Sequence, residues 1–189
     1  MREQVERCSW CVGDPLYEAY HDDEWGVPVH DDQALFERLM LEGFQAGLAW
    51  ITILRKPDNY FNAFDGWDPE IIAAYGPDDI ARLMGDAGII RNRLKIAGAV
   101  KNARAYLQLK EEGSFSDYLW SFVDGETVRA GIAPIAGQIP ATSPASDAMS
   151  KALKKRGFTF VGSKICYAFM QSAGLVDDHL AGCWKTVIR

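Results

Sequence analysis

The sequence predicts an all-α fold assembled from many short helices. Apolar residues recur at helical spacing along most of the 189-residue chain, as Leu35, Phe36, Leu39 and Met40 illustrate. Several such segments begin at proline or at a capping side chain and end at glycine, which are the usual helix boundaries. Strand signals are scarce, and the best of them is the short apolar run at 158–162. These observations favour a helical bundle over a sheet-based fold.

The first half of the chain contains a series of short expected helices. Their ranges are 31–48, 50–56, 59–64, 68–75 and 76–88. Asp31 or Asp32 supplies the cap of the first helix. Pro57 separates the second helix from the third, because proline breaks a helix that runs through it. The last two each carry proline near the first turn, where its missing N–H is harmless.

The second half contains the longest expected helix. The ranges expected there are 89–113, 114–123, 143–157 and 162–174. Gly113 closes the longest helix, and Ser143 caps the helix that follows the next loop. That loop, 124–142, is rich in glycine and proline without a clear period, so we expect it to run over the surface. The first 30 residues have no regular pattern and need another source of order.

The net charge of −6 argues on its own against a nucleic-acid-binding protein, but the distribution of charge tells more. Half of the twenty basic residues lie in two acid-free windows, 91–104 and 151–164. A basic face on an acidic body suits a polyanion such as DNA. Two ordinary solvated helix faces would give the same pattern, and charge alone does not decide between these interpretations.

The cellular compartment follows from what the sequence lacks. No stretch is long and apolar enough for a transmembrane span, and the first ten residues lack the apolar core of an export signal. We therefore expect a cytoplasmic protein without membrane contact. In that compartment four cysteines are thiols or metal ligands more often than disulfides.

Cysteine and histidine gather near both ends of the chain. His179 and Cys183 are four residues apart, a spacing that directs both side chains toward one metal on a helical turn. Cys8 and His21 lie at the opposite end, and two ligands from each terminus complete the tetrahedral set that structural zinc prefers. Such a site would tie down two ends that otherwise fray.

Cys11 leaves this assignment open. It forms a C-x-x-C with Cys8 and competes with it for one ligand position. The same spacing occurs in thioredoxin-like redox motifs, although the βαβ context of those motifs is absent. Unlinked surface histidines and buried cysteines are the remaining alternative.

Residues 85–95 have the pattern of a helix–hairpin–helix. A turn that contains Gly88 would expose backbone N–H groups at the start of the second helix, where they can hold a phosphate without reading sequence. Arg91, Arg93 and Lys95 add positive charge at the same place. The motif is a weak signal by itself, because ordinary turns between helices also contain glycine.

Aromatic side chains and one carboxylate form a candidate pocket. The aromatic residues are Trp10, Tyr17, Tyr20, Trp25 and Trp50. Glu42 interrupts an otherwise apolar run, and a carboxylate is seldom buried without a partner or a task. Rings and a carboxylate together suit a flat, electron-poor or cationic ligand. Core packing of the rings and a glutamate at a helix border are the alternatives that the pattern leaves open.

Several long motifs occur in one register over residues 6–183. In order, they are RCSW, DPLYEAYHDDEWGVP, LFERLMLEGFQAGLAWITIL, DAGIIRNRLKI, SDAMSKALKKRGFTFVG and GLVDDHLAGC. These motifs closely resemble the 3-methyladenine DNA glycosylase I family, all-helical members of the helix–hairpin–helix glycosylase superfamily. The number and order of the motifs make a chance match improbable.

The resemblance implies an enzyme of base-excision repair that acts on alkylated double-stranded DNA and releases 3-methyladenine. It implies one structural zinc ion per chain, bound by Cys8, His21, His179 and Cys183. The damaged base would be flipped into a pocket formed by Trp10, Tyr17, Tyr20 and Trp50. Glu42 would be the catalytic-site residue that reaches the base edge. DNA would contact Gly47 and Leu48 at the gap left by the flipped nucleotide and Gly88, Arg91 and Arg93 at the backbone.

The resemblance also implies how the chain is organised and how it acts. We expect one glycosylase-like unit over 1–189. Its parts would be zinc-clamped terminal segments at 1–30 and 175–189, a helical region at 31–123 with the hairpin at 85–95, and C-terminal helices at 143–174. Neither the hairpin lysine of bifunctional relatives nor their catalytic aspartate is found, which predicts a monofunctional enzyme without strand cleavage. A bacterial, cytoplasmic monomer that associates with the nucleoid when acting is expected.

Three positions depart from the family pattern. Cys11 is not a family ligand, and Trp184 stands where further cysteines follow Cys183. Phe44 occupies a position that is often polar. None of these departures removes an expected zinc ligand.

Two rival functions stand beside the glycosylase. A zinc-clamped module that binds DNA without excision would use the same basic windows and hairpin. A thiol–disulfide oxidoreductase would rest only on the C-x-x-C of Cys8 and Cys11.

Overall fold

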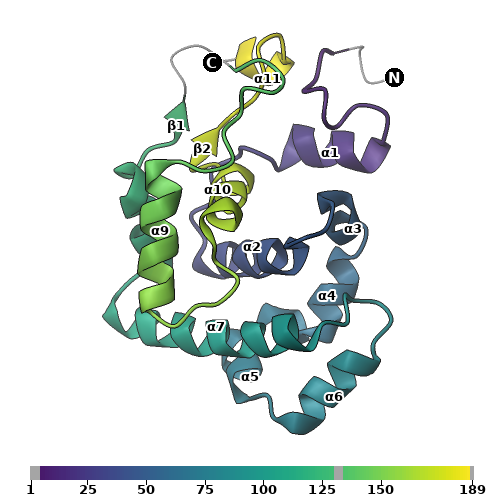
Figure 1. Ribbon diagram of the computed structural model, residues 1–189, viewed down its shortest axis with the longest axis vertical. Coiled ribbons are helices and arrows are strands. Elements are labelled where there is room, and N and C mark those ends of the chain that lie inside the picture. Colours follow the sequence, from purple (N-terminus) through teal and green to yellow (C-terminus); the bar gives the residue numbers. More distant parts are fainter. Residues whose placement is uncertain (1–4, 130–133, 188–189) are drawn as a thin grey trace.

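The computed structural model describes residues 5–129 and 134–187, and helices make up nearly all of its regular structure (Figure 1). The α-helices are α1 (Pro15–Asp23), α2 (Asp32–Gln45), α3 (Trp50–Leu54), α4 (Pro57–Ala63), α5 (Pro69–Ala74), α6 (Pro77–Gly85), α7 (Arg93–Glu112), α8 (Phe115–Trp120), α9 (Pro144–Lys155), α10 (Ser163–Ser172) and α11 (Trp184–Val187). Two short 3₁₀ turns are η1 (Asp65–Trp67) and η2 (Ser121–Val123). The all-α prediction is confirmed.

Capping chemistry places most helix starts where the sequence predicts them. The Asp31 carboxylate accepts a hydrogen bond from the backbone of Ala34 at 2.8 Å, so Asp31 rather than Asp32 is the cap of α2. Ser143 and Ser146 cap α9 reciprocally, each hydroxyl accepting from the other's backbone N–H. Pro57 is the first residue of α4, where no N–H is needed.

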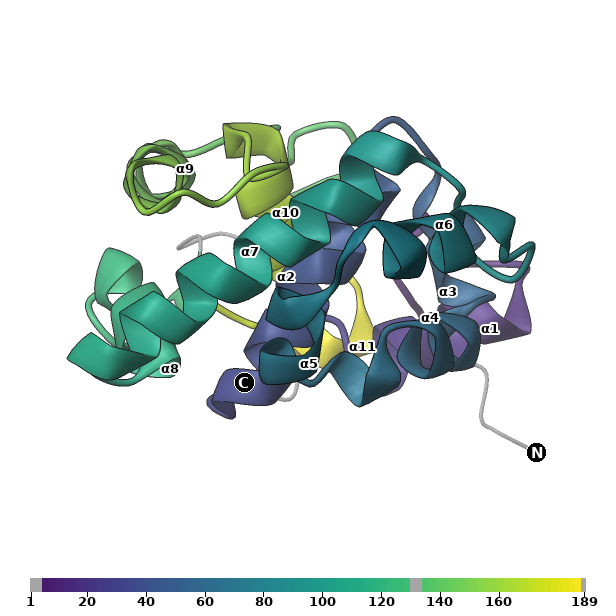
Figure 2. The same cartoon turned by 90° about the horizontal axis from the view of Figure 1, so that it is seen from below.

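Helices α2 and α10 lie at the centre of the molecule, and α7 runs across one side of them (Figures 1 and 2). Helices α5 and α6 cover α7 at its outer face, and α9 packs on α10. The main hydrophobic core fills the space between these helices. Leu35, Phe36 and Leu39 of α2 are fully buried there, as their helical spacing predicts.

The two ends of the described chain meet at one end of the molecule (top of Figure 1). The Trp184 backbone N–H donates to the Glu6 carbonyl at 2.8 Å, and the Trp184 indole N–H donates to Asp22 at 3.2 Å. Arg7 pairs with the same Asp22 carboxylate at 2.8 Å. A second, smaller hydrophobic cluster that includes Tyr20 lies beneath these contacts.

Three sequence expectations were wrong in their local detail. Residues 15–23 are not irregular, because Asp14 caps α1 by accepting from the Leu16 N–H at 3.0 Å. The longest helix begins at Arg93 rather than at 89, because the Asn92 side chain caps it by accepting hydrogen bonds from the backbone N–H groups of Leu94 and Lys95. Residues 158–162 form no strand: Phe160 has a positive φ of 56°, which breaks extended geometry.

The only strands in the described residues lie elsewhere. Strand β1 (Val128–Arg129), inside the expected long loop, pairs in parallel with β2 (Val176–Asp177). Residues 130–133 of that loop lie outside the described part. Within the described part of the chain, no helix is long and apolar enough to cross a membrane.

Candidate active site and metal-binding cluster

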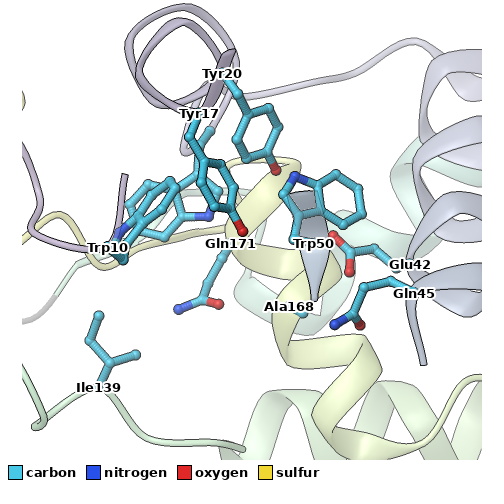
Figure 3. A pocket seen from close by; sticks show the side chains of 10 residues that line it. Trp10, Tyr17, Tyr20, Glu42, Gln45, Trp50, Ile139, Ala168 and Gln171 are labelled. Atoms are coloured by element: carbon cyan, nitrogen blue, oxygen red, sulfur yellow. The ribbon is translucent and has the colours of Figure 1, made fainter. Parts of the chain in front are cut away.

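A cavity of about 280 Å³ opens between α1, α2, α3 and α10 (Figure 3). Glu42 and the four predicted aromatic residues all line it: Trp10, Tyr17, Tyr20 and Trp50. The structure therefore brings together five side chains that are separated by as many as 40 positions in the sequence. Trp25, Gln45, Ile139, Ala168 and Gln171 complete the described lining.

The aromatic rings brace one another edge to face. Trp10 meets Tyr17 with ring centroids 5.4 Å apart and Trp25 with centroids 5.0 Å apart, both nearly perpendicular. Tyr20 and Trp50 are tilted against each other at 5.5 Å. Contacts of this kind hold ring faces and edges in fixed directions around the cavity. Such walls suit a flat ligand with a positive charge.

Glu42 is the buried acid of the cavity. Its side chain leaves α2 and reaches the cavity beside Trp50 (Figure 3), and the residue is only 3% exposed. Burial raises the pKa of the Glu42 carboxyl to about 8, although Ser172 and Arg38 oppose the shift. Burial also raises the pKa of the neighbouring Tyr20 hydroxyl well above its usual value. Its burial at the wall of a cavity makes the Glu42 carboxyl a candidate ligand-binding group.

Phe44, the departure from the family pattern, does not reach the cavity. It is 2% exposed and packs in the main core against Tyr60 and Phe64, with ring centroids 4.9 and 5.3 Å away. The side chain therefore contributes to packing, and the cavity wall on α2 comes from Glu42 and Gln45 instead.

A cluster of possible metal ligands lies directly beside the aromatic cavity. Ligand atoms of Cys8, His21 and Cys183 all lie within 4.8 Å of one another, and all three residues are buried. Nε2 of His21 and Sγ of Cys183 are 3.4 Å apart. The His179 ring centre is 5.0 Å from that of His21, so the fourth expected ligand adjoins the cluster.

Both histidines are oriented by carboxylates. Nδ1 of His21 contacts Asp22 at 2.9 Å, and Nδ1 of His179 contacts Asp177 at 2.8 Å. A carboxylate only accepts, so Nδ1 carries the proton and Nε2 remains as the ligand atom. Gly26 leaves room for this arrangement, since a Cβ there would lie 2.7 Å from the His179 ring. This donor set fits a structural zinc ion.

The prediction that His179 and Cys183 share a helical turn was wrong. Strand β2 ends at Asp177, and α11 begins only at Trp184, so both side chains are carried by the loop between them. That loop is bound to the N-terminal segment, where the Leu180 N–H donates to Sγ of Cys8 at 3.2 Å. The two residues lie at the same cluster, but the loop brings them there and not a helical turn.

Cys11 stands apart from the cluster. It is 1% exposed, and its thiol donates to the carbonyl of Cys8 at 3.1 Å. All four cysteines, Cys166 in the core included, are free thiols. A buried thiol turned toward a backbone carbonyl is poorly placed for redox exchange.

The turn between α2 and α3 carries Gly47 and Leu48 at the surface. Gly47 has a φ of +80°, and Leu48 is 36% exposed. The amide nitrogen of Gln45 donates to the Leu48 carbonyl at 2.5 Å, which closes the turn. An exposed apolar side chain on a tight, braced turn could fill a gap in a base stack.

Lys95 does not join the basic surface that the sequence predicts. The residue is 8% exposed, and its ammonium donates to the carbonyls of Phe44 and Ala46 at 2.8 and 2.7 Å. These are the orphan carbonyls at the end of α2, so Lys95 caps that helix and braces the following turn. Arg91 and Arg93 are exposed.

The segment between α6 and α7 contains Gly88, whose backbone groups are already engaged. The Gly88 N–H donates to Asp86 at 2.7 Å, and the Gly88 carbonyl accepts from Lys56 at 3.0 Å. A Cβ at this position would lie 2.9 Å from the Asp86 carboxylate and 3.3 Å from Asn59. A side chain at this position would push the Asp86 carboxylate aside, and a phosphate here would compete with that carboxylate for the N–H.

Comparison with known proteins shows the family of the chain. The family model of methyladenine glycosylases matches residues 10–186. The chain belongs to the methyladenine glycosylase family. This match covers the aromatic cavity and α2 together, and it includes three of the four expected metal ligands.

Several relatives match nearly the whole chain. DNA-3-methyladenine glycosylase 1 of Escherichia coli is 54% identical over 180 residues, 95% of this chain and 96% of the relative. The Haemophilus influenzae DNA-3-methyladenine glycosylase is 49% identical over 94% of this chain and 96% of the relative. A crystal structure of a 3-methyladenine DNA glycosylase I superposes with a TM-score of 0.92 at 53% identity, covering 95% and 98% of the two chains.

A more distant member of this glycosylase family bears on ligand recognition. The Staphylococcus aureus 3-methyladenine DNA glycosylase I structure concerned with 3-methyladenine recognition superposes with a TM-score of 0.90 at 38% identity. It covers 94% of this chain and 95% of the other.

Proposed function

We propose that this chain is a monofunctional DNA glycosylase of base-excision repair. It hydrolyses the N-glycosidic bond of 3-methyladenine in alkylated double-stranded DNA and releases the free base, acting as a monomer. The observation that carries the proposal is the cavity in which the buried carboxyl of Glu42 lies among aromatic rings. The names of the Escherichia coli and Haemophilus influenzae relatives support the same substrate.

Recognition follows from the charge of the substrate. Methylation at N3 leaves the adenine ring cationic, and cations bind to the faces of tryptophan and tyrosine. We infer that a base flipped from the duplex enters between Trp10, Tyr20 and Trp50. The oxygens of Glu42 would accept hydrogen bonds from the amino edge of the base, and its positive charge would compensate the burial of the carboxylate.

The same charge reduces the catalysis that is needed. The bond between C1′ and the cationic base is already weak, and its electron pair neutralises the ring as the base leaves. The enzyme therefore does not have to protonate the leaving group. Holding the flipped nucleotide with its glycosidic bond open to water supplies the remaining rate through orientation. Glu42 and the rings would act by binding the base, and nothing in this scheme requires strand cleavage.

The remaining DNA contacts belong to the proposal as well. Leu48 and Gly47 would occupy the space left by the flipped nucleotide. The helix–hairpin–helix at Gly88 would lie near a backbone phosphate, with Arg91 and Arg93 adding favourable charge.

We infer that one zinc ion joins the termini through Cys8, His21, His179 and Cys183, as the donor set suggests. Zinc supplies a redox-inert, closed coordination site that does no chemistry on DNA. The residues of this clamp would fix α1, and with it the tyrosines at the cavity. The redox alternative finds no support in the buried position of Cys11.

Incubation of the zinc-loaded protein with N-methylated duplex DNA tests the proposal. Chromatography of the supernatant should show free 3-methyladenine, and denaturing gels without alkali should show intact strands. Tight DNA binding with no base released would instead favour the non-enzymatic reader. Strand breaks without alkali would contradict the monofunctional mechanism.

A further inference from the structure

A second cavity adjoins the aromatic one on its open side. This groove, of about 440 Å³, runs from the turn at Gly47 to the start of α10 at Lys164. The two cavities share three lining residues, which are Gln45, Ala168 and Gln171. Gly47, which is proposed to lie at the gap left by the flipped nucleotide, lines this groove, so with the base in the aromatic cavity we place its sugar at this junction. The bond to be hydrolysed therefore passes between the shared residues.

Neither aspartate nor glutamate is among the three residues that the two cavities share. The described lining of the groove contains neither aspartate nor glutamate, and Glu42 belongs to the aromatic cavity alone. Ala168 is apolar. The two glutamines are thus the shared polar side chains that can contact the sugar or a water molecule beside it.

The side-chain amide of Gln171 is held in one orientation by Asp178. Its amide nitrogen donates to the Asp178 carboxylate at 2.8 Å, and the Tyr167 hydroxyl donates to the same oxygen at 2.7 Å. Asp178 is 6% exposed and Tyr167 is 5% exposed. Since a carboxylate only accepts, the nitrogen must face Asp178, and the amide oxygen is left to face the cavity. Figure 3 shows the Gln171 amide reaching into the cavity between Ile139 and Ala168.

Gln45 is anchored to a more exposed partner. Its amide nitrogen donates to the carbonyl of Leu48, which lies on an exposed turn that is proposed to contact DNA. Gln171 instead projects from the last turn of α10, and its own backbone carbonyl accepts from the Gly26 N–H at 3.0 Å. A preorganised dipole is more effective in catalysis than one that must reorganise.

We propose that Gln171 is a catalytic residue whose amide oxygen orients the attacking water at C1′. This inference rests on the proposed function. The bond from C1′ to the ring nitrogen breaks, and its electron pair neutralises the methylated base. The water oxygen forms the new bond to C1′, and its second proton passes to bulk water. The Gln171 oxygen accepts a hydrogen bond from that water throughout and takes no proton, because an amide is too weak a base.

Asp178 acts one step further back as a positioning residue. It fixes which end of the Gln171 amide faces the junction and touches no reacting atom. Replacing Asp178 by asparagine offers a donor as well as an acceptor, so the Gln171 amide would no longer be held in one orientation. Its effect on rate should therefore depend entirely on the presence of Gln171.

The proposal is tested by the rate of base release in two variants and by the affinity for the free base. Gln171→Met keeps the length of the side chain and removes the acceptor, and Gln108→Met makes the same change on the exposed face of α7. Single-turnover release of 3-methyladenine from methylated duplex should fall about 10- to 100-fold in Gln171→Met and stay unchanged in Gln108→Met. The Kd of free 3-methyladenine, followed by tryptophan fluorescence, should stay within about threefold, because the rings and Glu42 that are proposed to bind the base are unchanged.

The opposite results are equally clear. A Gln171→Met enzyme with the wild-type rate would overturn the proposal. A loss of base affinity as large as the loss of rate would also overturn it, since Gln171 would then contact the base rather than the water. Release of 3-methyladenine by the wild-type protein in the same assay verifies the proposed function separately.

A double-mutant cycle tests the link to Asp178. Asp178→Asn should slow release, while Asp178→Asn combined with Gln171→Met should be no slower than Gln171→Met alone. Additive losses would show that Asp178 does not act through Gln171. Zinc content is measured on each variant, because Asp178 precedes His179 in the chain.

Discussion

Replacing Glu42 by glutamine should stabilise the free protein at neutral and alkaline pH. The carboxyl has a pKa of about 8 in the fold against an ordinary value of 4.5. Because the folded-state pKa is the higher one, the protonated form favours folding. The stability that this form supplies is complete below about pH 4.5 and is lost as the pH rises through about 8. Glutamine has nearly the same shape and remains neutral throughout.

The size of the effect follows from the two pKa values. Their separation of about 3.5 pH units corresponds to about 5 kcal/mol above pH 8, at about 1.4 kcal/mol per unit. Side-chain relaxation and water entry reduce the cost of a buried charge, so we expect Glu42→Gln to gain about 2–5 kcal/mol at pH 8. At pH 5 the two proteins should differ by less than about 1 kcal/mol.

Urea unfolding of both zinc-loaded proteins at pH 5, 6, 7 and 8 measures this difference. The control is Glu111→Gln, which removes an exposed carboxylate from α7 and should change stability by less than about 0.5 kcal/mol at every pH. A gain for Glu42→Gln that does not grow with pH would refute the reasoning, as would a loss of stability at pH 8. Excision of 3-methyladenine by the same variant should weaken, because the base edge loses its acceptor carboxylate.

Three further perturbations test the supports of the site. Lys95→Met should lower the unfolding free energy by about 2–4 kcal/mol, because it leaves the carbonyls of Phe44 and Ala46 at the end of α2 unpaired. Lys101→Met, at an exposed position of α7, is the control and should cost little. Equal melting temperatures for the two variants would contradict this. Cys8→Ser should lose the zinc, measured by elemental analysis, and Cys11→Ser should keep it; the reverse pattern would make Cys11 the ligand. Arg91→Gln should lower the slope of log Kd for DNA against log salt by about 1 without changing the affinity for free base, and an unchanged slope would remove Arg91 from the interface.

Local chemistry made most of the helical fold predictable. Three helix starts are set by a single residue each: Asp31 and Ser143 cap a helix with their side chains, and Pro57 occupies a first helical position. These starts therefore lie where the sequence predicts them. Helix α1 was missed because its sequence is largely polar, although Asp14 before a proline is a start signal of the same kind. Two-residue strands such as β1 have no period to detect.

Tertiary contacts explain the other differences. The run at 158–162 alternates like a strand, yet Phe160 takes a positive φ and packs its ring over Gly98, where a Cβ would lie 2.8 Å from it. Lys95 lies in a basic window of the sequence, but its ammonium donates to two carbonyls at the end of α2 and is buried there. Neither partner is near in sequence, so no local pattern could reveal the contact.

Some residues of the candidate site could be found from the sequence, and others only from the structure. Glu42 drew attention because a glutamate in an apolar run is unusual, but its place in a pocket with the aromatic residues came from the resemblance to the family. Gln171 gave no such signal, since a glutamine inside a helix is ordinary. Its proposed role depends on Asp178, which lies in the segment after β2 and accepts a hydrogen bond from the amide. A residue whose role comes from its neighbour is found only in the folded chain.

Binding of free bases to the zinc-loaded protein tests most directly the central claim that the aromatic cavity recognises the methylated base. Titration of 3-methyladenine should change the fluorescence of the tryptophans that line the cavity, Trp10, Trp25 and Trp50, and should saturate at one base per chain. Unmethylated adenine should bind at least about tenfold more weakly. Equal affinities for the two bases, or no saturable binding of 3-methyladenine, would contradict the account.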